Sequence, residues 1–222
     1  MTGSVVSQGQ HRIMPPRSKE AIRAYLLKQD RSLRPLLTQL PFPVARRNRD
    51  VYATLLRSII SQQLSVKAAN TIHARVLALF PEAYPTPALM RKIPIARLRT
   101  AGMSRQKAQY LRSVACFAME QGMEYDTLSA FTDAEIIEHL TQIHGVGRWT
   151  VEMLLIFSFQ RRDVFAVDDV GIQNAMQTLY RLENRSKALK PTMLAIAEKW
   201  RPYRAIVCKY LWRWKDQLAG KR

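Results

Sequence analysis

Apolar side chains recur every three or four positions along most of this chain, which is the spacing of one face of an α-helix. In segment 51–62 they share a single face, at Tyr52, Leu55, Leu56, Ile59 and Ile60. No convincing run alternates apolar and polar residues, as a strand on a half-buried sheet would. The pattern therefore predicts an all-α protein.

Residues that favour helix starts divide the chain further. Ser65 and Ser104 are expected N-caps for helices that run to about residues 80 and 120. Thr86 is expected to cap a shorter helix, and Pro94 is expected in the first turn of another that ends near Gly102. Thr132 and Glu135 have the spacing of a capping box ahead of a helix over 136–143. The remaining periodicity predicts helices over 149–159, 169–180, 191–200 and 202–218.

The charge balance of the chain indicates the kind of partner that it binds. The 222 residues include 35 Lys and Arg against 17 Asp and Glu, a formal net charge of +18. Such a balance suits a polyanion, either a nucleic acid or an anionic membrane surface. No apolar stretch approaches the roughly 20 residues of a membrane span, and residues 1–17 have the composition of a flexible basic tail without a signal-peptide core. The composition therefore favours nucleic acid over a membrane.

The two cysteines, Cys116 and Cys208, lie far apart in the sequence, each within an apolar helical pattern. Buried thiols in a reducing compartment are therefore favoured over a disulfide. Two thiols also cannot ligate an iron–sulfur cluster, which requires four ligands. The sequence accordingly predicts no such cluster.

The most informative motif is Gly145-Val146-Gly147, which lies between two predicted helices. Glycines at both positions permit positive φ and leave backbone N–H groups uncovered near a helix N-terminus, where an anion such as phosphate is favoured. Arg148 and Thr150 would add a charge and a hydroxyl, and Val146 would plug into the core. A plain tight turn is the alternative, but the basic charge of the chain favours phosphate binding.

Asp168 and Asp169 follow a short apolar stretch and open a predicted helix. A single aspartate at a helix start is ordinarily an N-cap, because its carboxylate accepts hydrogen bonds from free backbone N–H groups. Two adjacent aspartates exceed what one cap requires. The pair is therefore a candidate for chemistry, although capping alone would account for either residue by itself.

Residues 143–151 resemble the helix-hairpin-helix of the HhH-GPD superfamily of base-excision DNA glycosylases, whose consensus is Leu-Pro-Gly-Val-Gly-x-x-Thr-Ala. His144 stands where that consensus has proline. The resemblance extends over about residues 18–218 and implies a two-lobed, all-α domain with the active site in the cleft between the lobes. The lobes expected from it are residues 45–125 and residues 18–44 plus 126–218.

The superfamily hairpin also holds a monovalent cation through main-chain carbonyls. The resemblance places this Na+ or K+ at the carbonyls of Thr141, Ile143 and Val146, and it implies no other cofactor. Because backbone atoms would be the ligands, no side-chain pattern supports this site beyond the resemblance itself.

In the alkylation-repair branch of the superfamily, the AlkA type, an Asp-Asp pair stands in this place and its second member is catalytic. That role maps to Asp169, with a structural or capping role for Asp168. Cleavage of an N-glycosidic bond builds positive charge on the deoxyribose, and a carboxylate beneath the sugar either stabilises that charge or activates a water.

Trp149 decides which kind of glycosylase the resemblance implies. It occupies the place of the lysine nucleophile of bifunctional members, within a Gly-Arg-Trp-Thr run that the AlkA type shares. An indole is not a nucleophilic amine, so a monofunctional enzyme is implied. The alternative is that Trp149 is an ordinary core residue.

A base must leave the duplex to be cut, which calls for a residue to fill the gap and an aromatic surface to receive the base. Segment 61–65 resembles the superfamily loop that inserts into DNA, with Gln63 aligned to the intercalating residue and Leu64 as the second choice. Trp212 matches the tryptophan of the AlkA-type pocket, where an indole stacks on a cationic purine, and Met153 stands where that pocket has tyrosine. A polar turn and helix core are the alternatives for 61–65 and Trp212.

The sequence therefore predicts a monofunctional DNA glycosylase that excises alkylated purines, such as 3-methyladenine and 7-methylguanine, from double-stranded DNA and leaves an abasic site. We expect a monomer without the additional N-terminal α/β domain often found in the AlkA type, located in a bacterial cytoplasm with the nucleoid or in a eukaryotic nucleus. The alternatives are a non-catalytic helix-hairpin-helix DNA-binding protein, a bifunctional glycosylase/lyase and a glycosylase for another damaged base.

Overall fold

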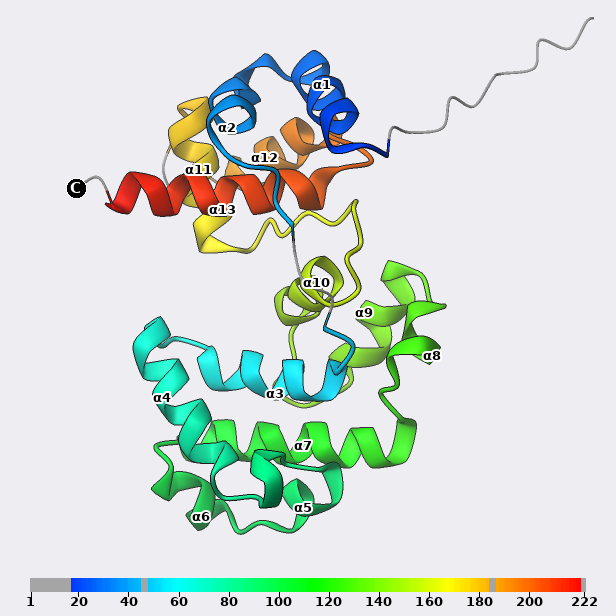
Figure 1. The fold of residues 1–222 in the computed structure, drawn as a ribbon, viewed down its shortest axis with the longest axis vertical. Coiled ribbons are helices and arrows are strands. Elements are labelled where there is room, and N and C mark those ends of the chain that lie inside the picture. Colours follow the sequence, from blue (N-terminus) through cyan, green and yellow to red (C-terminus); the bar gives the residue numbers. More distant parts are fainter. Residues whose placement is uncertain (1–16, 45–47, 184–186, 221–222) are drawn as a thin grey trace, which may run out of the picture.

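The computed structural model describes residues 17–44, 48–183 and 187–220, which form helices joined by loops with no strand among them (Figure 1). The prediction of an all-α fold is therefore confirmed. Residues 1–16 of the expected N-terminal tail lie outside the described part of the chain.

Most helices begin and end close to the predicted boundaries. In chain order the α-helices and the short 3-10 helices (η) are α1 (Lys19–Gln29), η1 (Arg31–Leu33), α2 (Arg34–Gln39), α3 (Val51–Ser61), α4 (Val66–Leu77), η2 (Pro81–Ala83), α5 (Pro87–Lys92), α6 (Ile95–Thr100), α7 (Arg105–Gln121), α8 (Tyr125–Ser129), α9 (Asp133–Thr141), α10 (Arg148–Phe157), α11 (Val170–Tyr180), α12 (Leu189–Glu198) and α13 (Arg204–Gly220). The helices α1, α2 and α8 had no counterpart among the predicted elements, and α2 and α8 are too short to hold a periodic pattern.

The predicted caps are present at all four helix starts, including Thr86, whose hydroxyl accepts a hydrogen bond from the N–H of Leu89 at the start of α5. The Ser65 hydroxyl accepts a hydrogen bond from the N–H of Ala68, and the Ser104 hydroxyl does the same for Lys107. At α9, Thr132 and Glu135 form the reciprocal pair of bonds that defines a capping box. These caps satisfy N–H groups that lack a partner within the helix, so they fix where each helix begins.

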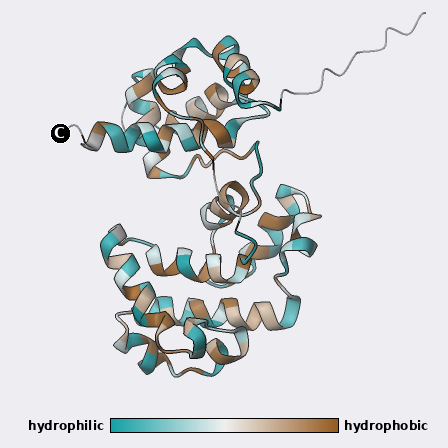
Figure 2. Cartoon of the chain, in the orientation of Figure 1, coloured by the Kyte–Doolittle hydropathy of each residue, from teal (hydrophilic) through white to brown (hydrophobic). Residues whose placement is uncertain are grey.

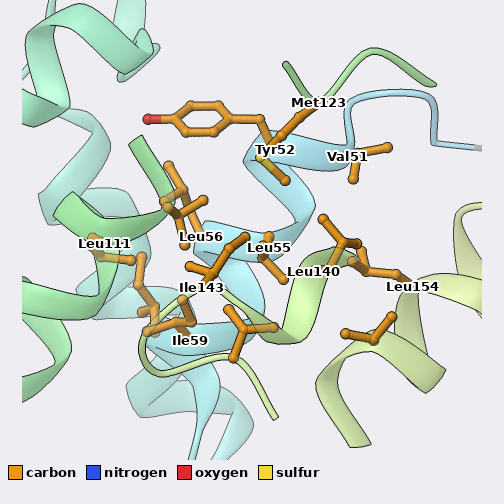
Figure 3. Packing of buried hydrophobic residues seen from close by; sticks show 14 of the residues in the cluster. Val51, Tyr52, Leu55, Leu56, Ile59, Leu111, Met123, Leu140, Ile143 and Leu154 are labelled. Atoms are coloured by element: carbon orange, nitrogen blue, oxygen red, sulfur yellow. The ribbon is translucent and has the colours of Figure 1, made fainter. Parts of the chain in front are cut away.

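The first of two hydrophobic clusters surrounds α3, which packs against α4, α7 and α10. All five apolar positions predicted on one face of segment 51–62 are buried in it. Figure 3 shows how this face meets side chains of the other helices, among them Leu111 of α7, Leu140 of α9 and Leu154 of α10. The periodicity of the sequence thus identified the centre of this cluster.

The second cluster joins α1 and α2 to α11, α12 and α13. These helices lie together at one end of the molecule, with α3–α7 at the other end and α8–α10 between them (Figure 1). The clusters divide the chain at a different place from the expected lobes. Buried residues of 128–159 belong to the first cluster rather than to 18–44 and 165–211, because α10 packs on α3 and α9.

A buried carboxylate connects the parts of the second cluster. Asp30 accepts hydrogen bonds from the Tyr180 hydroxyl at 2.7 Å and from Trp200 Nε1 at 3.0 Å. It also accepts the N–H of Ser32 and so caps η1. A buried charge is tolerated only when it is hydrogen-bonded in this way, so Asp30 fixes the N-terminal helices against α11 and the end of α12.

Hydrophobic and hydrophilic residues are mixed along the helices (Figure 2). Within the described residues, no helix has both the length and the apolar character that crossing a membrane requires.

Both cysteines are free thiols. Cys208 is buried, as predicted, whereas Cys116 is partly exposed, so the predicted burial of Cys116 is wrong.

Candidate functional site

Asp169 lies at the N-terminus of α11, where N–H donors surround its carboxylate. Oδ1 accepts hydrogen bonds from the backbone N–H of Ile172 and from Trp212 Nε1, both at 2.8 Å. Oδ2 accepts a third from Trp149 Nε1 at 3.1 Å. An ionised carboxylate only accepts hydrogen bonds, so three donors match its chemistry and fix its orientation.

The two indoles reach Asp169 from different parts of the fold. Trp149 lies in the first turn of α10, within the part of the chain that packs in the first cluster. Trp212 lies on α13 and packs against both clusters. The structure therefore brings together three residues proposed from the sequence and places the carboxylate where the two clusters meet.

A glycine that sequence reasoning missed makes room for this arrangement. A Cβ on Gly171 would lie 2.9 Å from Asp169 Oδ1 and 3.1 Å from Trp212 Cδ1. A side chain here would push the carboxylate or the indole out of place. The available signal was a glycine in the first turns of a helix, where its intrinsic propensity is poor.

An exposed aromatic ring continues the surface of Trp212. Phe157, at the end of α10, is 41 % exposed, and its ring centroid lies 5.4 Å from that of Trp212. Lys209 Nζ lies 5.6 Å from the centre of the Phe157 ring. Neither Phe157 nor Lys209 was predicted. The one-turn spacing from Met153 to Phe157 along α10 was the available signal.

Asp168 is placed differently from its neighbour. It is exposed, and its carboxylate pairs with Lys190 Nζ at 2.5 Å. The N-cap bond of α11 is made by Asp169, so a capping role for Asp168 is wrong. Met153 is partly buried against the first cluster. The assignment of Asp168 and Met153 to a base pocket stays a prediction.

The two glycines of the hairpin have different structural roles. Gly145 has a φ of +95°, and a Cβ there would lie 2.1 Å from Cγ of Tyr110, so the backbone rests directly on the tyrosine ring. Gly147 has a φ of −95°, and a Cβ there would meet nothing within 4 Å in the described chain. Gly145 thus adopts the positive φ that glycine permits, whereas Gly147 does not and instead leaves the start of α10 open.

The start of α10 combines features that favour an anion. Gly147 is the N-cap and supplies no side-chain oxygen to the first backbone N–H groups, and Arg148 beside them has 65 % of its side chain exposed. Val146 is buried in the first cluster, as predicted. Thr150 is only 3 % exposed because it lies on the inward face of α10, so the expected surface hydroxyl is wrong.

The turn between α3 and α4 contains both candidates for the residue that inserts into the duplex. Gln63 is exposed and has a φ of +57°, and Leu64 is 39 % exposed. Lys107 of α7 donates hydrogen bonds to the carbonyls of Ile60 at 2.9 Å and Gln62 at 2.5 Å. The structure therefore presents Gln63 and Leu64 together, and it adds a supporting lysine that was not among the predicted site residues.

A carboxylate that sequence reasoning missed lies buried one turn behind the hairpin. Glu152 is 3 % exposed; its Oε1 accepts a hydrogen bond from Arg148 Nε at 3.0 Å, while Oε2 is buried without a hydrogen-bond partner among the described residues. Burial raises the pKa of Glu152, Arg148 partly opposes the rise, and Asp168 adds to it.

The hairpin glycines allow a paired test. Gly145→Ala should destabilise the protein by about 2 kcal/mol or more, because the new methyl group meets Tyr110 and the backbone is in the left-handed region. Gly147→Ala should cost less than about 1 kcal/mol, since its space is open, yet should weaken DNA binding by covering the N–H groups. Urea unfolding and DNA-binding titrations measure the two effects. Equal destabilisation by both substitutions would contradict this description of the hairpin.

Glu152 should make stability depend on pH. Its pKa in the folded protein is raised above the ordinary 4.5, so the folded state binds the proton more tightly than the unfolded chain. The associated stability is present below the unfolded pKa and is lost as pH rises through the folded pKa.

We therefore expect Glu152→Gln to be at least as stable as wild type at about pH 8 and to flatten the pH profile of urea unfolding. Glu138→Gln, an exposed position on α9, should leave the profile unchanged. A clear loss of stability in Glu152→Gln at this pH would show that the ion pair with Arg148 outweighs the cost of burial.

Comparison with known proteins places these features in a family. A model of the HhH-GPD superfamily of base excision DNA repair proteins matches residues 56–202, which include the hairpin and Asp169. DNA-3-methyladenine glycosylase 1 of Schizosaccharomyces pombe is 38 % identical over 168 residues, which cover 74 % of this chain and 72 % of that protein.

Two solved structures are similar over most of the chain. The 3-methyladenine DNA glycosylase of Schizosaccharomyces pombe in complex with abasic DNA has a TM-score of 0.76 at 34 % identity, covering 86 % of this chain and 95 % of that one. A DNA-3-methyladenine glycosidase from Bacillus halodurans has a TM-score of 0.75 at 31 % identity, covering 93 % and 94 % respectively.

Proposed function

Since the chain belongs to the HhH-GPD superfamily of base excision DNA repair proteins, we propose that it is a monofunctional glycosylase for alkylated purines in double-stranded DNA. The predicted superfamily and the predicted role as a base excision repair glycosylase are confirmed by the family match and the relatives. The observation that carries the finer proposal is the carboxylate of Asp169 held between two indole N–H groups.

Asp169 acts on the sugar of the flipped nucleotide. As the bond between C1′ and the base nitrogen breaks, its electron pair leaves with the base and positive charge develops at C1′. The fixed carboxylate stabilises this charge without reorganising, because its hydrogen bonds are already made. Water then adds to C1′ and loses a proton, which leaves an abasic site.

Trp149 supports the monofunctional part of the proposal. A glycosylase/lyase requires an amine that attacks C1′ and forms a Schiff base. The only N–H of the Trp149 side chain donates to Asp169, so this residue orients the carboxylate instead. The reaction therefore ends with water, and the DNA strand stays intact.

The aromatic surface beside Asp169 supports alkylated purines as substrates. A purine alkylated as in 3-methyladenine or 7-methylguanine nucleotides carries positive charge, which is attracted to the face of an electron-rich indole. Trp212 supplies that indole, and Phe157 extends it. Such a base also leaves as a neutral molecule. The relatives named for 3-methyladenine support the same class of substrate.

The hairpin and the turn between α3 and α4 supply the grip on DNA. Backbone N–H groups after Gly147 and the guanidinium of Arg148 bind a phosphate without reading sequence. Gln63 or Leu64 fills the space that the flipped base leaves. In this proposal the protein binds DNA and flips the base as a monomer.

We also propose that a monovalent cation binds to the hairpin carbonyls of Thr141, Ile143 and Val146, as the resemblance implies. The Ile143 carbonyl accepts a hydrogen bond from the N–H of Val146 at 3.0 Å, and its second lone pair suits a cation. A bound Na+ or K+ would supply positive charge next to a DNA phosphate.

Asp169→Asn tests the catalytic assignment without removing the helix cap. Asparagine caps helices about as well as aspartate, but its NH2 group cannot accept the hydrogen bond from Trp149 Nε1, so stability should fall by up to about 2 kcal/mol. The negative charge is lost, so single-turnover release of 7-methylguanine from methylated duplex should fall by at least about a hundredfold.

The matched control is Asp126→Asn, whose side chain is 80 % exposed on α8 and which should release bases at the wild-type rate. A wild-type protein that releases no base would refute the proposed glycosylase activity. Strand breaks formed without alkali would indicate a lyase. Release by Asp169→Asn at the wild-type rate would mean that another acid is catalytic.

A further inference from the structure

One face of α7 contacts both elements proposed to grip DNA. Lys107 donates hydrogen bonds to the carbonyl of Ile60 in α3 and to the carbonyl of Gln62. Gln62 is the first residue of the turn formed by residues 62–65, which we call the wedge turn. Tyr110, three residues further along the same helix, lies directly beneath Gly145 of the hairpin. Residues three apart share a helix face, so a single rigid element supports both contacts.

The contact made by Lys107 is specific. Its ammonium group donates to two carbonyls, of Ile60 and Gln62, in the region where the last carbonyls of a helix lack intrahelical partners. Bonds from a charged donor are stronger than bonds between neutral groups. The side chain is partly buried, and this burial lowers the pKa of Lys107. Lys107 therefore closes the end of α3 and fixes the direction in which the chain leaves it.

The wedge turn has a backbone shape that needs such support. Gln63 has a φ of +57°, in the left-handed region that residues with a Cβ disfavour. The turn also contains a hydrogen bond from the N–H of Leu64 to the carbonyl of Ser61 at 3.2 Å. A strained conformation persists only where its surroundings fix it, and Lys107 bonds to the residue immediately before Gln63.

Tyr110 is equally well fixed on the hairpin side. Its ring lies edge-on to the ring of His144, with centroids 4.9 Å apart, and its hydroxyl is hydrogen-bonded to Gln106 Nε2 at 2.5 Å. Because the backbone at Gly145 rests on this ring, the hairpin cannot move closer to α7. The height of the hairpin above α7 is therefore set by one side chain.

We propose that Lys107 is a positioning residue for base flipping, which together with Tyr110 makes α7 a rigid spacer between the wedge turn and the phosphate-binding hairpin. This inference rests on the proposed glycosylase function. The wedge must enter the duplex beside the phosphate that the hairpin holds. A loosened turn should therefore matter most when the base has to be drawn out of an intact stack.

The test compares two DNA substrates. One carries 7-methylguanine in a fully paired duplex, and the other carries it in a single-nucleotide bulge, where less stacking has to be broken. Lys107→Met keeps the length of the apolar stem and removes the two hydrogen bonds. We expect its single-turnover rate, corrected for spontaneous depurination, to fall by on the order of tenfold on the paired duplex and by less than about threefold on the bulge.

Two further variants separate this role from general effects. Lys107→Arg keeps a charged donor and should recover most of the rate on the paired duplex. Lys92→Met, at an exposed position at the end of α5, removes one positive charge and should match wild type on both substrates. Equal losses by Lys107→Met on the paired and bulged substrates, or no loss on either, would overturn the proposal.

Amide hydrogen exchange tests the same inference without catalysis. In Lys107→Met, exchange of the backbone amides of residues 62–65 should speed up at least about threefold, while the amides of α10 and α11 should keep their wild-type protection. Unchanged exchange in the wedge turn would refute the role of Lys107 even if the enzyme is active. A wild-type protein that releases no base, with faster exchange in the variant, would instead refute the proposed function and with it the role in flipping.

Discussion

The hydrogen bonds to Asp169 require the two hydrophobic clusters to meet in one arrangement. Trp149 comes from the side of α10 and Trp212 from α13, and both must place an indole N–H within about 3 Å of the same carboxylate. The loop between α10 and α11 is fixed to the start of α13, because Arg204 Nε donates a hydrogen bond to Asp163 Oδ1 at 2.7 Å. Packed cores deform little, so the position of the carboxylate is set by the docking of the clusters.

The same need for close approach explains where glycines occur. Gly171 lets Trp212 reach Asp169, and Gly145 lets the hairpin rest on Tyr110. Gly147, by contrast, has open space where a side chain would be, and it lies at the surface proposed for phosphate. One glycine of the hairpin therefore serves packing and the other serves access, a division that the sequence motif does not reveal.

Sequence reasoning was most successful where the chemistry is local. Helix periodicity and caps predicted most elements, because these signals depend on neighbouring residues, whereas the choice of Asp169 and Trp149 as site residues came from the resemblance to the superfamily. The burial of Thr150 depends on how α10 is rotated, and the role of Lys107 depends on carbonyls 45 and 47 positions away. Contacts of this kind are set by tertiary packing, which no local pattern encodes. For the same reason the division of the chain between the two clusters differs from the lobes expected.

The central claim is that the carboxylate of Asp169 stabilises positive charge on the sugar. The most direct measurement is the affinity for two duplexes in which the target deoxyribose is replaced either by a cationic pyrrolidine or by a neutral tetrahydrofuran. Wild-type protein should bind the cationic duplex at least about tenfold more tightly, and Asp169→Asn should lose that preference. Equal affinity of the wild type for both duplexes, or an unchanged preference in Asp169→Asn, would contradict the claim.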